Sequence, residues 1–329
     1  MNFIGDDREQ NLKTRVAWLY HMEGLTQEAI AEKVEISRAR VLKILAQCRQ
    51  DGTVQIRVTS KLSACVELER RLEAAFGFSK AVVIPTPSDE DAIPHLLGLT
   101  AGGYISDSLR DGMTIGLGWG RTLQASINAI QPRPLRGLTV VSLLGGLTRA
   151  TGLNPSEFAW RFADLLEAES YLLSAPVFAP SEAIKQALFA HQGIEEVLIR
   201  ARHLDLAIVG AGDFAPSATI PRYGLLGKTE IDDLMSMGAV GDVLCHFFNR
   251  EGQLLDHPVN RRVMALDPLE LRRATKLVLA SGGWRKLPAI LGAIRLLRPS
   301  VLLTDVGAAE GLLERYDELS ARGESIFAE

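Results

Sequence analysis

Four cationic side chains and no anionic one lie between residues 37 and 50: Arg38, Arg40, Lys43 and Arg49. A guanidinium group can form two parallel hydrogen bonds with the edge of guanine, which is worth about 1–3 kcal/mol of discrimination between bases. We expect such contacts from Arg38 and Arg40, which lie near the amino end of a predicted helix. Lys43 and Arg49 are expected to contact phosphates, which add affinity without sequence information.

A helix, a short turn and a second helix are predicted to position these cations. Thr26 and Ser37 are typical N-cap residues, because their hydroxyl groups accept hydrogen bonds from the first turn. The second helix has an inward apolar stripe at i, i+3, i+4 and i+7: Val41, Ile44, Leu45 and Cys48. An ordinary helical hairpin with a basic, solvated face is the alternative. We expect DNA contacts from six residues: Thr26, Gln27, Ser37, Arg38, Arg40 and Lys43.

The flanking segments complete an N-terminal domain over residues 1–60. Residues 12–23 predict a leading helix that ends at Gly24 and places Trp18 in the shared core. Residues 52–58 alternate like the strand of a winged helix-turn-helix domain. Residues 61–77 predict a linker helix, which either only connects the domains or also forms a dimer contact.

The run GLTQEAIAEKVEISRARVLKILAQCRQDGTVQIRV resembles the N-terminal domain of the SorC family of sugar-responsive bacterial transcriptional regulators, which are SorC/DeoR-type proteins. That family usually has glycine in the turn, for its left-handed conformation, where this sequence has Glu35. A residue other than glycine at positive φ is uncommon and costs some stability.

Short apolar runs alternate with amphipathic helices over residues 78–329. The predicted strands are 81–84, 114–117, 138–143, 170–173, 206–209, 277–280 and 301–304. The predicted helices are 91–110, 121–130, 155–168, 181–190, 193–203, 286–297 and 307–316. This alternation predicts an α/β domain with a parallel sheet covered on both faces. Residues 240–249 predict an antiparallel insertion.

A glycine-rich loop, residues 116–122, follows the strand predicted over 114–117. Its backbone N–H groups could approach an anion, and Arg121 and Thr122 could add side-chain donors. We expect this loop to bind a sugar or a sugar phosphate. A dinucleotide site is disfavoured, because the spacing is GxGxG rather than GxGxxG and no acid ends the next strand. A turn without a ligand is the remaining alternative.

Other glycine-rich or polar loops follow the remaining strands, at the edge where open α/β sheets bind ligands. Asp242 could accept hydrogen bonds from hydroxyl groups, and Lys286 could pair with a phosphate or a carboxylate. Each has a structural alternative: Asp242 could cap a turn and Lys286 could be solvated. Asp305 could likewise cap the last helix.

Seven motifs resemble the SorC-family effector-binding domain: GLGWGRTL, LLGGL, APVFAP, VGAGDF, GAVGDVLCHFFNREG, SGGWRKLPAIL and LLTDVGAAEGLL. That domain is Rossmann-like and similar to phosphosugar isomerases. By position, the resemblance implies ligand contacts from Gly118, Gly120, Thr122, Asp242 and Lys286. Val306 stands where the family more often has an acid. The expected effector site is Gly118, Trp119, Gly120, Arg121, Thr122, Gly145, Gly146, Asp242 and Lys286.

Composition and charge agree with a cytoplasmic protein. The net charge is −4, but residues 1–60 hold nine Lys/Arg and eight Asp/Glu, so the positive charge is local. There is no run of 18 apolar residues that would span a membrane. Cys48, Cys65 and Cys245 lack metal-ligand spacing and are expected to be reduced core thiols.

The sequence therefore predicts a transcriptional regulator, a repressor, of a carbohydrate or polyol operon. Its expected partners are operator DNA, a sugar, polyol or sugar-phosphate effector and further copies of the chain, as a dimer or tetramer. No cofactor or metal and no enzymatic activity are expected. The alternative is a phosphosugar isomerase or deaminase fused to a DNA-binding domain, but no close acid–base pair stands out among Asp242, His246 and Asp305.

Overall fold

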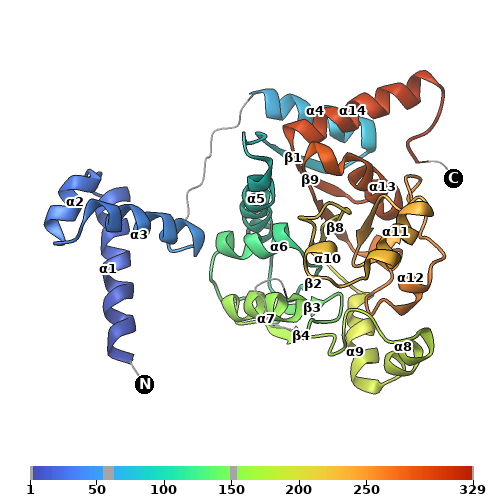
Figure 1. Cartoon of the computed structure of the whole chain (residues 1–329), viewed down its shortest axis with the longest axis horizontal. Coiled ribbons are helices and arrows are strands. Elements are labelled where there is room, and N and C mark those ends of the chain that lie inside the picture. The colour runs from blue at the N-terminus through green and yellow to red at the C-terminus, as the bar shows by residue number, and fades with distance from the viewer. Residues whose placement is uncertain (1–2, 55–62, 149–153, 328–329) are drawn as a thin grey trace. The chain divides into compact units, whose positions relative to one another are not determined.

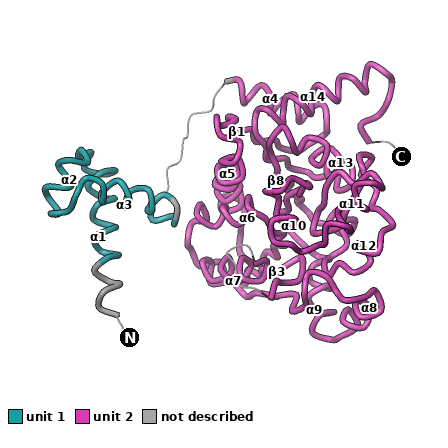
Figure 2. Tube along the Cα trace, in the orientation of Figure 1, with its two compact units in different colours: residues 1–60 teal, residues 61–329 magenta. Residues whose placement is uncertain are grey.

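A computed structural model describes residues 3–54, 63–148 and 154–327 of the chain. The chain divides into two compact units, residues 1–60 and 61–329 (Figures 1 and 2). Each unit has buried apolar side chains of its own. In the described residues, no helix is both long and apolar enough to cross a membrane.

The first unit contains the predicted helix-turn-helix. Its helices are α1 (Phe3–His21), α2 (Gln27–Lys33) and α3 (Arg38–Gln50). Their shared core consists of Val16, Ala17, Leu19, Ile30, Val41, Ile44, Leu45 and Cys48. The inward stripe predicted for the second helix is thus confirmed. Glu35 has a φ of 55°, so the turn keeps its left-handed conformation without glycine.

Trp18 is not in this core, and that prediction was wrong. Its surface is 57% exposed, because Ala17 and Leu19 on either side of it already face α2 and α3. The predicted strand over 52–58 lies mostly outside the described residues. Within them, Val54 donates its backbone N–H to the carbonyl oxygen of Cys48 at 2.9 Å.

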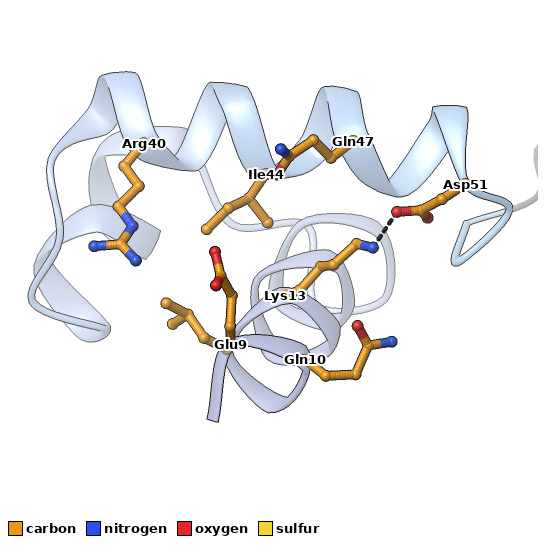
Figure 3. Close-up of a pocket in the computed structure, with 8 residues that line it drawn as sticks. Glu9, Gln10, Lys13, Arg40, Ile44, Gln47 and Asp51 are labelled. Atoms are coloured by element: carbon orange, nitrogen blue, oxygen red, sulfur yellow. Dashed lines mark hydrogen bonds and ion pairs between the residues drawn. The ribbon is translucent and has the colours of Figure 1, made fainter. Parts of the chain in front are cut away.

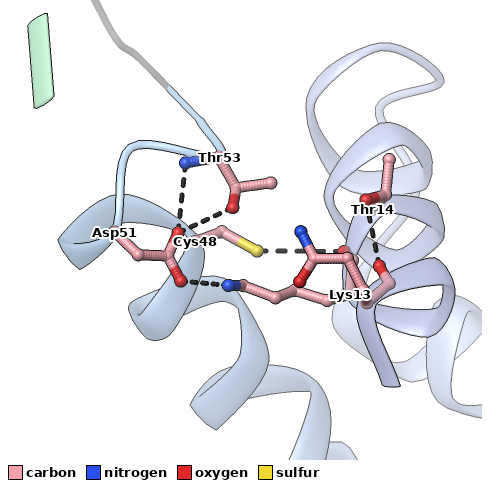
Figure 4. A network of polar contacts seen from close by, with 6 residues as sticks. Lys13, Thr14, Cys48, Asp51 and Thr53 are labelled. Atoms are coloured by element: carbon pink, nitrogen blue, oxygen red, sulfur yellow. Dashed lines mark hydrogen bonds and ion pairs between the residues drawn. The ribbon is translucent and has the colours of Figure 1, made fainter. Parts of the chain in front are cut away.

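A polar network joins α1 to the end of α3 (Figure 4). Lys13 Nζ pairs with Asp51, whose Oδ1 also accepts hydrogen bonds from the backbone N–H and the hydroxyl of Thr53, at 3.1 and 2.7 Å. Cys48 Sγ donates to the carbonyl oxygen of Lys13 at 3.8 Å. Burial alone would raise the pKa of Asp51, but the hydrogen bonds from Lys13 and Thr53 lower it overall. The network fixes the angle between the two helices.

The second unit is built on a seven-stranded sheet in the order β1-β9-β8-β5-β2-β3-β4. All of its neighbouring strands are parallel. The strands are β1 (Lys80–Ile84), β2 (Thr114–Leu117), β3 (Thr139–Ser142), β4 (Glu169–Tyr171), β5 (Leu206–Val209), β8 (Lys276–Ala280) and β9 (Val301–Asp305). The seven predicted strands and their parallel arrangement are confirmed.

Helices cover both faces of this sheet (Figure 1). Side chains from α5 (Ile93–Ser108), α6 (Arg121–Ser126) and α7 (Pro155–Leu165) form one cluster. Side chains from α4 (Ser63–Phe76), α9 (Gln192–Ala201), α13 (Leu287–Leu297) and α14 (Val306–Ala321) belong to the other. The predicted antiparallel insertion is present as β6 (Gly241–Val243) and β7 (His246–Phe248).

Several short elements were not predicted from the sequence. They are α10 (Thr219–Arg222), α11 (Lys228–Ser236), α12 (Pro258–Arg262) and η3 (Glu270–Arg273). The short helices η1 (Glu90–Ala92) and η4 (Trp284–Lys286) begin just before the predicted helical ranges 91–110 and 286–297 and extend into them. Two others, η2 (Ile127–Ala129) and α8 (Glu182–Phe189), lie within the predicted helical ranges 121–130 and 181–190. Elements of three to nine residues are too short for the hydrophobic period that identifies a helix to become visible.

The helix predicted as a linker over 61–77 is α4, and it packs within the second unit. Leu72 is fully buried and Phe76 stacks on Phe78 with ring centroids 5.4 Å apart. Glu69 and Glu73 accept the backbone N–H groups of Val83 and Ala81 at 3.1 and 2.9 Å. These contacts tie α4 to the edge strand β1, so α4 is a structural part of the α/β unit.

We expect Leu72→Ala to lower the free energy of unfolding of the second unit by about 2–5 kcal/mol, because it opens a cavity beneath α4. Urea denaturation followed by circular dichroism measures this change. The control is Arg71→Ala, whose exposed ion pair with Asp317 spans 3.9 Å and should contribute at most ~0.5 kcal/mol. Equal effects of the two changes would show that α4 does not pack as described.

Candidate functional site

The caps of the helix-turn-helix have the predicted geometry. The hydroxyl of Thr26 accepts the backbone N–H of Ala29 at 3.2 Å, and the hydroxyl of Ser37 accepts that of Arg40 at 3.2 Å. Gln27 begins α2 and is half-buried. Ser37 has extended backbone, and its side chain caps the first turn, so α3 begins at Arg38.

The cations of α3 separate onto two sides of the helix. Arg38 forms an ion pair with Glu28 of α2 at 3.1 Å, and Lys43 is exposed. Arg40 instead lines a pocket of about 370 Å³ between α1 and α3, with Glu9 on the opposite wall (Figure 3). Arg40 and Lys43, at i and i+3, therefore lie on one side of α3, and Arg38 and Arg49 lie on the other; all four side chains are exposed.

In the second unit, the parallel strands bring the expected effector residues to one edge of the sheet. Gly118 follows β2 and donates its N–H to the carbonyl oxygen of Ile208 at 2.9 Å. A Cβ atom added to Gly118 would lie 3.3 Å from Leu244, which belongs to the turn between β6 and β7. The structure thus brings the glycine loop next to the β6–β7 hairpin, whose first strand contains Asp242.

The glycine loop has fewer groups free to bind an anion than its sequence suggests. Gly120 has a φ of 117°, which favours glycine, and it caps α6, a helix of six residues. The guanidinium of Arg121 donates to the carbonyl oxygen of Asp91 at 3.1 Å. Trp119 is only 9% exposed and packs among apolar side chains. Thr122 lies half-buried in the first turn of α6.

Asp242 is a buried carboxylate at the same edge. Its Oδ2 accepts the backbone N–H of Cys245 at 3.0 Å, so it does cap the turn, as the structural alternative proposed. Burial raises the pKa of Asp242 to about 6; the hydrogen bond from Cys245 and the charge of Lys286 oppose this rise, and Asp213 adds to it. Burial also raises the pKa of the Cys245 thiol.

Gly212 makes room for this carboxylate. The backbones of Gly212 and Asp242 form an antiparallel bridge. A Cβ atom added to Gly212 would lie 2.0 Å from Asp242 Oδ1, so a side chain at this position would displace the carboxylate. Glycine is therefore required at position 212 so that the backbone can approach the Asp242 carboxylate closely. The sequence around Gly212 did not reveal this role.

Asp213 lies close enough to Asp242 to act on its pKa, but it was not among the residues expected from the sequence. Its Oδ1 is buried and has no hydrogen-bond partner among the described residues. Lys286 Nζ lies nearby and donates to the carbonyl oxygen of Ala211 at 3.4 Å. Asp213, Asp242 and Lys286 thus form a cluster of two carboxylates and one ammonium group, which we call the carboxylate cluster. An unpaired buried acceptor needs a donor, and a ligand hydroxyl could supply it.

Other residues at this edge have structural partners instead. The N–H groups of Gly145 and Gly146 donate to the carbonyl oxygens of Met264 and Ala175, both at 2.8 Å. Asp305 caps α14 and accepts hydrogen bonds from Gly307 and Gly283, at 3.1 and 2.6 Å. Its Oδ2 also accepts the hydroxyl of Thr86 at 2.6 Å.

His246, weighed as a catalytic group, is enclosed by protein. Burial lowers the pKa of His246 to about 3, and the charge of Lys185 contributes, so its imidazole is neutral at physiological pH. Among the described residues, no group of three or more potential metal ligands is assembled.

Comparisons with known proteins agree with this architecture. A family model described as "Putative sugar-binding domain" matches residues 60–314. The erythritol catabolism regulatory protein EryD of Brucella abortus (strain 2308) is 29% identical over 309 residues, which cover 93% of this chain and 98% of that protein. The deoxyribonucleoside regulator of Bacillus subtilis (strain 168) is also 29% identical, over 94% of this chain and 99% of that protein.

Solved structures extend the similarity to the fold of the whole chain. The full-length sorbitol operon regulator SorC from Klebsiella pneumoniae is 26% identical, with a TM-score of 0.69, and covers 93% of this chain and 99% of that one. A DeoR family transcriptional regulator from Listeria monocytogenes is 26% identical, with a TM-score of 0.71, over 76% of this chain and 100% of that one.

The raised pKa of Asp242 predicts how stability depends on pH. The folded protein binds this proton more tightly than the unfolded chain, so the contribution of Asp242 to stability is largest below pH 3.8 and is lost as pH rises through about 6. Asp242→Asn keeps an acceptor for Cys245 without the charge. We expect it to stabilise the protein at pH 8 by on the order of 2 kcal/mol, and by progressively less below pH 6.

Thermal unfolding of both proteins between pH 5 and 8 measures this difference. Asp232→Asn, at an exposed position of α11, is the matched control and should show no such dependence. A lower melting temperature for Asp242→Asn than for wild type at pH 8 would mean that the ionised carboxylate stabilises the fold.

Proposed function

We propose that this chain, which belongs to the sugar-binding domain family of SorC-type transcriptional regulators, represses a carbohydrate or polyol operon and releases its operator when a sugar or polyol binds. The relatives that match it over nearly its whole length are named as transcriptional regulators. The chain is accordingly a DNA-binding regulator with a sugar-type effector. Repression, the effector class and the residues involved are the parts that we propose.

The first unit is the DNA-binding part. Its outward cations lie on a capped helix that follows a four-residue connection, which is the arrangement that places a recognition helix in the major groove. We assign base contacts to Arg38 and phosphate contacts to Lys43 and Arg49. Thr26, Gln27 and Ser37 lie at helix amino ends, where N–H groups can contact phosphates. Arg40 is also exposed in the first turn of α3, and we assign it a base contact beside that of Arg38.

The carboxylate cluster is the observation that favours a hydroxyl-rich effector. Two carboxylates and one ammonium group carry a net negative charge when ionised, which repels a phosphate but accepts hydrogen bonds from hydroxyls. We therefore place the hydroxyl groups of the effector against Asp213 and Asp242, with Lys286 beside them. Gly118, Gly120 and Thr122 line the neighbouring loop. Erythritol, the polyol after which the Brucella abortus relative is named, has the chemistry that such a cluster would bind.

The alternative of a phosphosugar isomerase or deaminase has less support. Such an enzyme needs a general base within reach of the substrate. Asp305 is fully engaged as a helix cap, and His246 is buried beside a cation. Incubation of the protein with sugar phosphates, with product analysis, tests this alternative directly.

Effector control would operate by a population shift. If the effector binds one conformation of the second unit better, it changes how two DNA-binding units are held in an oligomer. A coupling of about 1–3 kcal/mol is enough for a 5–150-fold change in DNA affinity. We propose that the working form is a cytoplasmic dimer or tetramer, because two recognition helices must reach two half-sites.

Lys286→Met should separate effector binding from DNA binding. The substitution keeps the aliphatic stem but removes the charge beside Asp242, so we expect effector binding to weaken while DNA affinity stays unchanged. Thermal unfolding against a panel of polyols, sugars and sugar phosphates first finds the effector, since a ligand at 100 times its Kd adds about 2.7 kcal/mol of stability. A wild-type response from Lys286→Met would remove this residue from the site, and a hit only among phosphates would reverse the effector class.

Lys43→Ala should weaken DNA binding and leave effector binding unchanged. Removing one phosphate contact reduces the slope of log affinity against log salt by about one and weakens binding to all sequences alike. Electrophoretic mobility shifts with a duplex selected from a randomised library measure this slope. Lys33→Ala is the control, because Lys33 lies on α2 and pairs with Glu23 at 3.4 Å. An unchanged slope for Lys43→Ala would exclude the phosphate contact.

A further inference from the structure

The outward face of α3 carries a second apolar stripe, which is exposed at Ala39 and Leu42 and half-buried at Ala46. Ala39, Leu42 and Ala46 recur at i, i+3 and i+7, so they share one side of the helix. Leu42 is 46% exposed, and Ala39 is also exposed. A helix normally has one such stripe, and α3 already buries Val41 and its neighbours in the core.

Cations border this stripe on both sides. Arg38 and Arg49 lie along one edge, four residues before and seven residues after Leu42, and Lys43 lies four residues after Ala39 on the other edge. From Arg38 to Gln50 the helix carries no acidic side chain. A strip that is apolar along its centre and positive along its margins is complementary to a DNA groove, where base edges lie between two rows of phosphates.

The base edge that such a strip would contact is that of thymine. In the major groove, thymine alone among the four bases presents a methyl group, and apolar side chains discriminate in favour of it. Alanines at 39 and 46 let the helix approach closely, and Leu42 extends between them. Resting on the proposed DNA-binding function, we propose that Leu42, supported by Ala39, reads the thymine C5-methyl group in each operator half-site.

Arg38 would then read a neighbouring base. Its exposed ion pair with Glu28 holds it at the amino end of the stripe, and such a pair costs little to open. The operator half-site is therefore expected to combine a guanine, contacted by Arg38, with thymine at the position of Leu42. A second copy of the chain is the other occupant that could cover the stripe.

The experiment replaces thymidine by 2′-deoxyuridine, whose uracil base lacks only the C5-methyl group of thymine. The full-length protein first selects duplexes from a randomised library. Each thymine of the best duplex is then replaced in turn, and Kd is measured at fixed salt. Loss of one buried methyl group should weaken wild-type binding about four-fold at the position read by Leu42. Leu42→Ala should bind the thymine and uracil duplexes at that position equally.

Met22→Ala is the matched control, because Met22 is an exposed apolar residue of the same unit at 67% exposure and should keep the wild-type ratio. Insensitivity of wild type to every uracil replacement, or an unchanged ratio in Leu42→Ala, overturns the assignment. A change of oligomeric state in Leu42→Ala with an unchanged ratio assigns the stripe to a contact between copies. Failure to enrich any duplex overturns DNA binding itself, and this proposal with it.

Discussion

The parallel alignment of the seven central strands is the constraint on which the second unit depends. Because every strand runs in the same direction, all of their carboxyl ends meet at one edge, and residues far apart in the sequence become neighbours there. Gly118 after β2, Asp213 after β5 and Lys286 after β8 come together for this reason alone. The antiparallel β6–β7 hairpin adds Asp242 to the same edge through its bridge to Gly212.

Burial of the Asp242 carboxylate opposes the stability of that arrangement. Its raised pKa means that the folded protein holds an ionised group in a place that disfavours charge at neutral pH. Asp213 has a buried oxygen without a partner among the described residues and increases the same strain. If effector hydroxyl groups donate hydrogen bonds to these carboxylates, as proposed, relief of this cost would add to the affinity for the effector.

Much of this architecture was predictable from the sequence, because short apolar runs between amphipathic segments and helix caps are local signals. These signals predicted the two helix caps, Thr26 and Ser37, and all seven strands of the sheet. Contacts with distant partners could not be predicted: the N–H of Gly145 donates to the carbonyl oxygen of Met264, 119 residues later, and the glycine-rich context could not show this. Asp213 was missed for the same reason, since an unpaired acceptor is visible only when its surroundings are known. Whether the expected DNA and effector residues bind their ligands stays a prediction.

The small core of the first unit has a consequence for the lifetime of the protein in the cell. Among its described residues, eight buried side chains form the core of this unit, so we expect it to open at a lower free energy than the much larger second unit. Proteases cleave opened forms, and a ligand that binds only the folded form protects it. Copies bound to an operator would therefore be degraded more slowly than free copies. The fraction of operator sites that are bound would then influence how much regulator the cell retains.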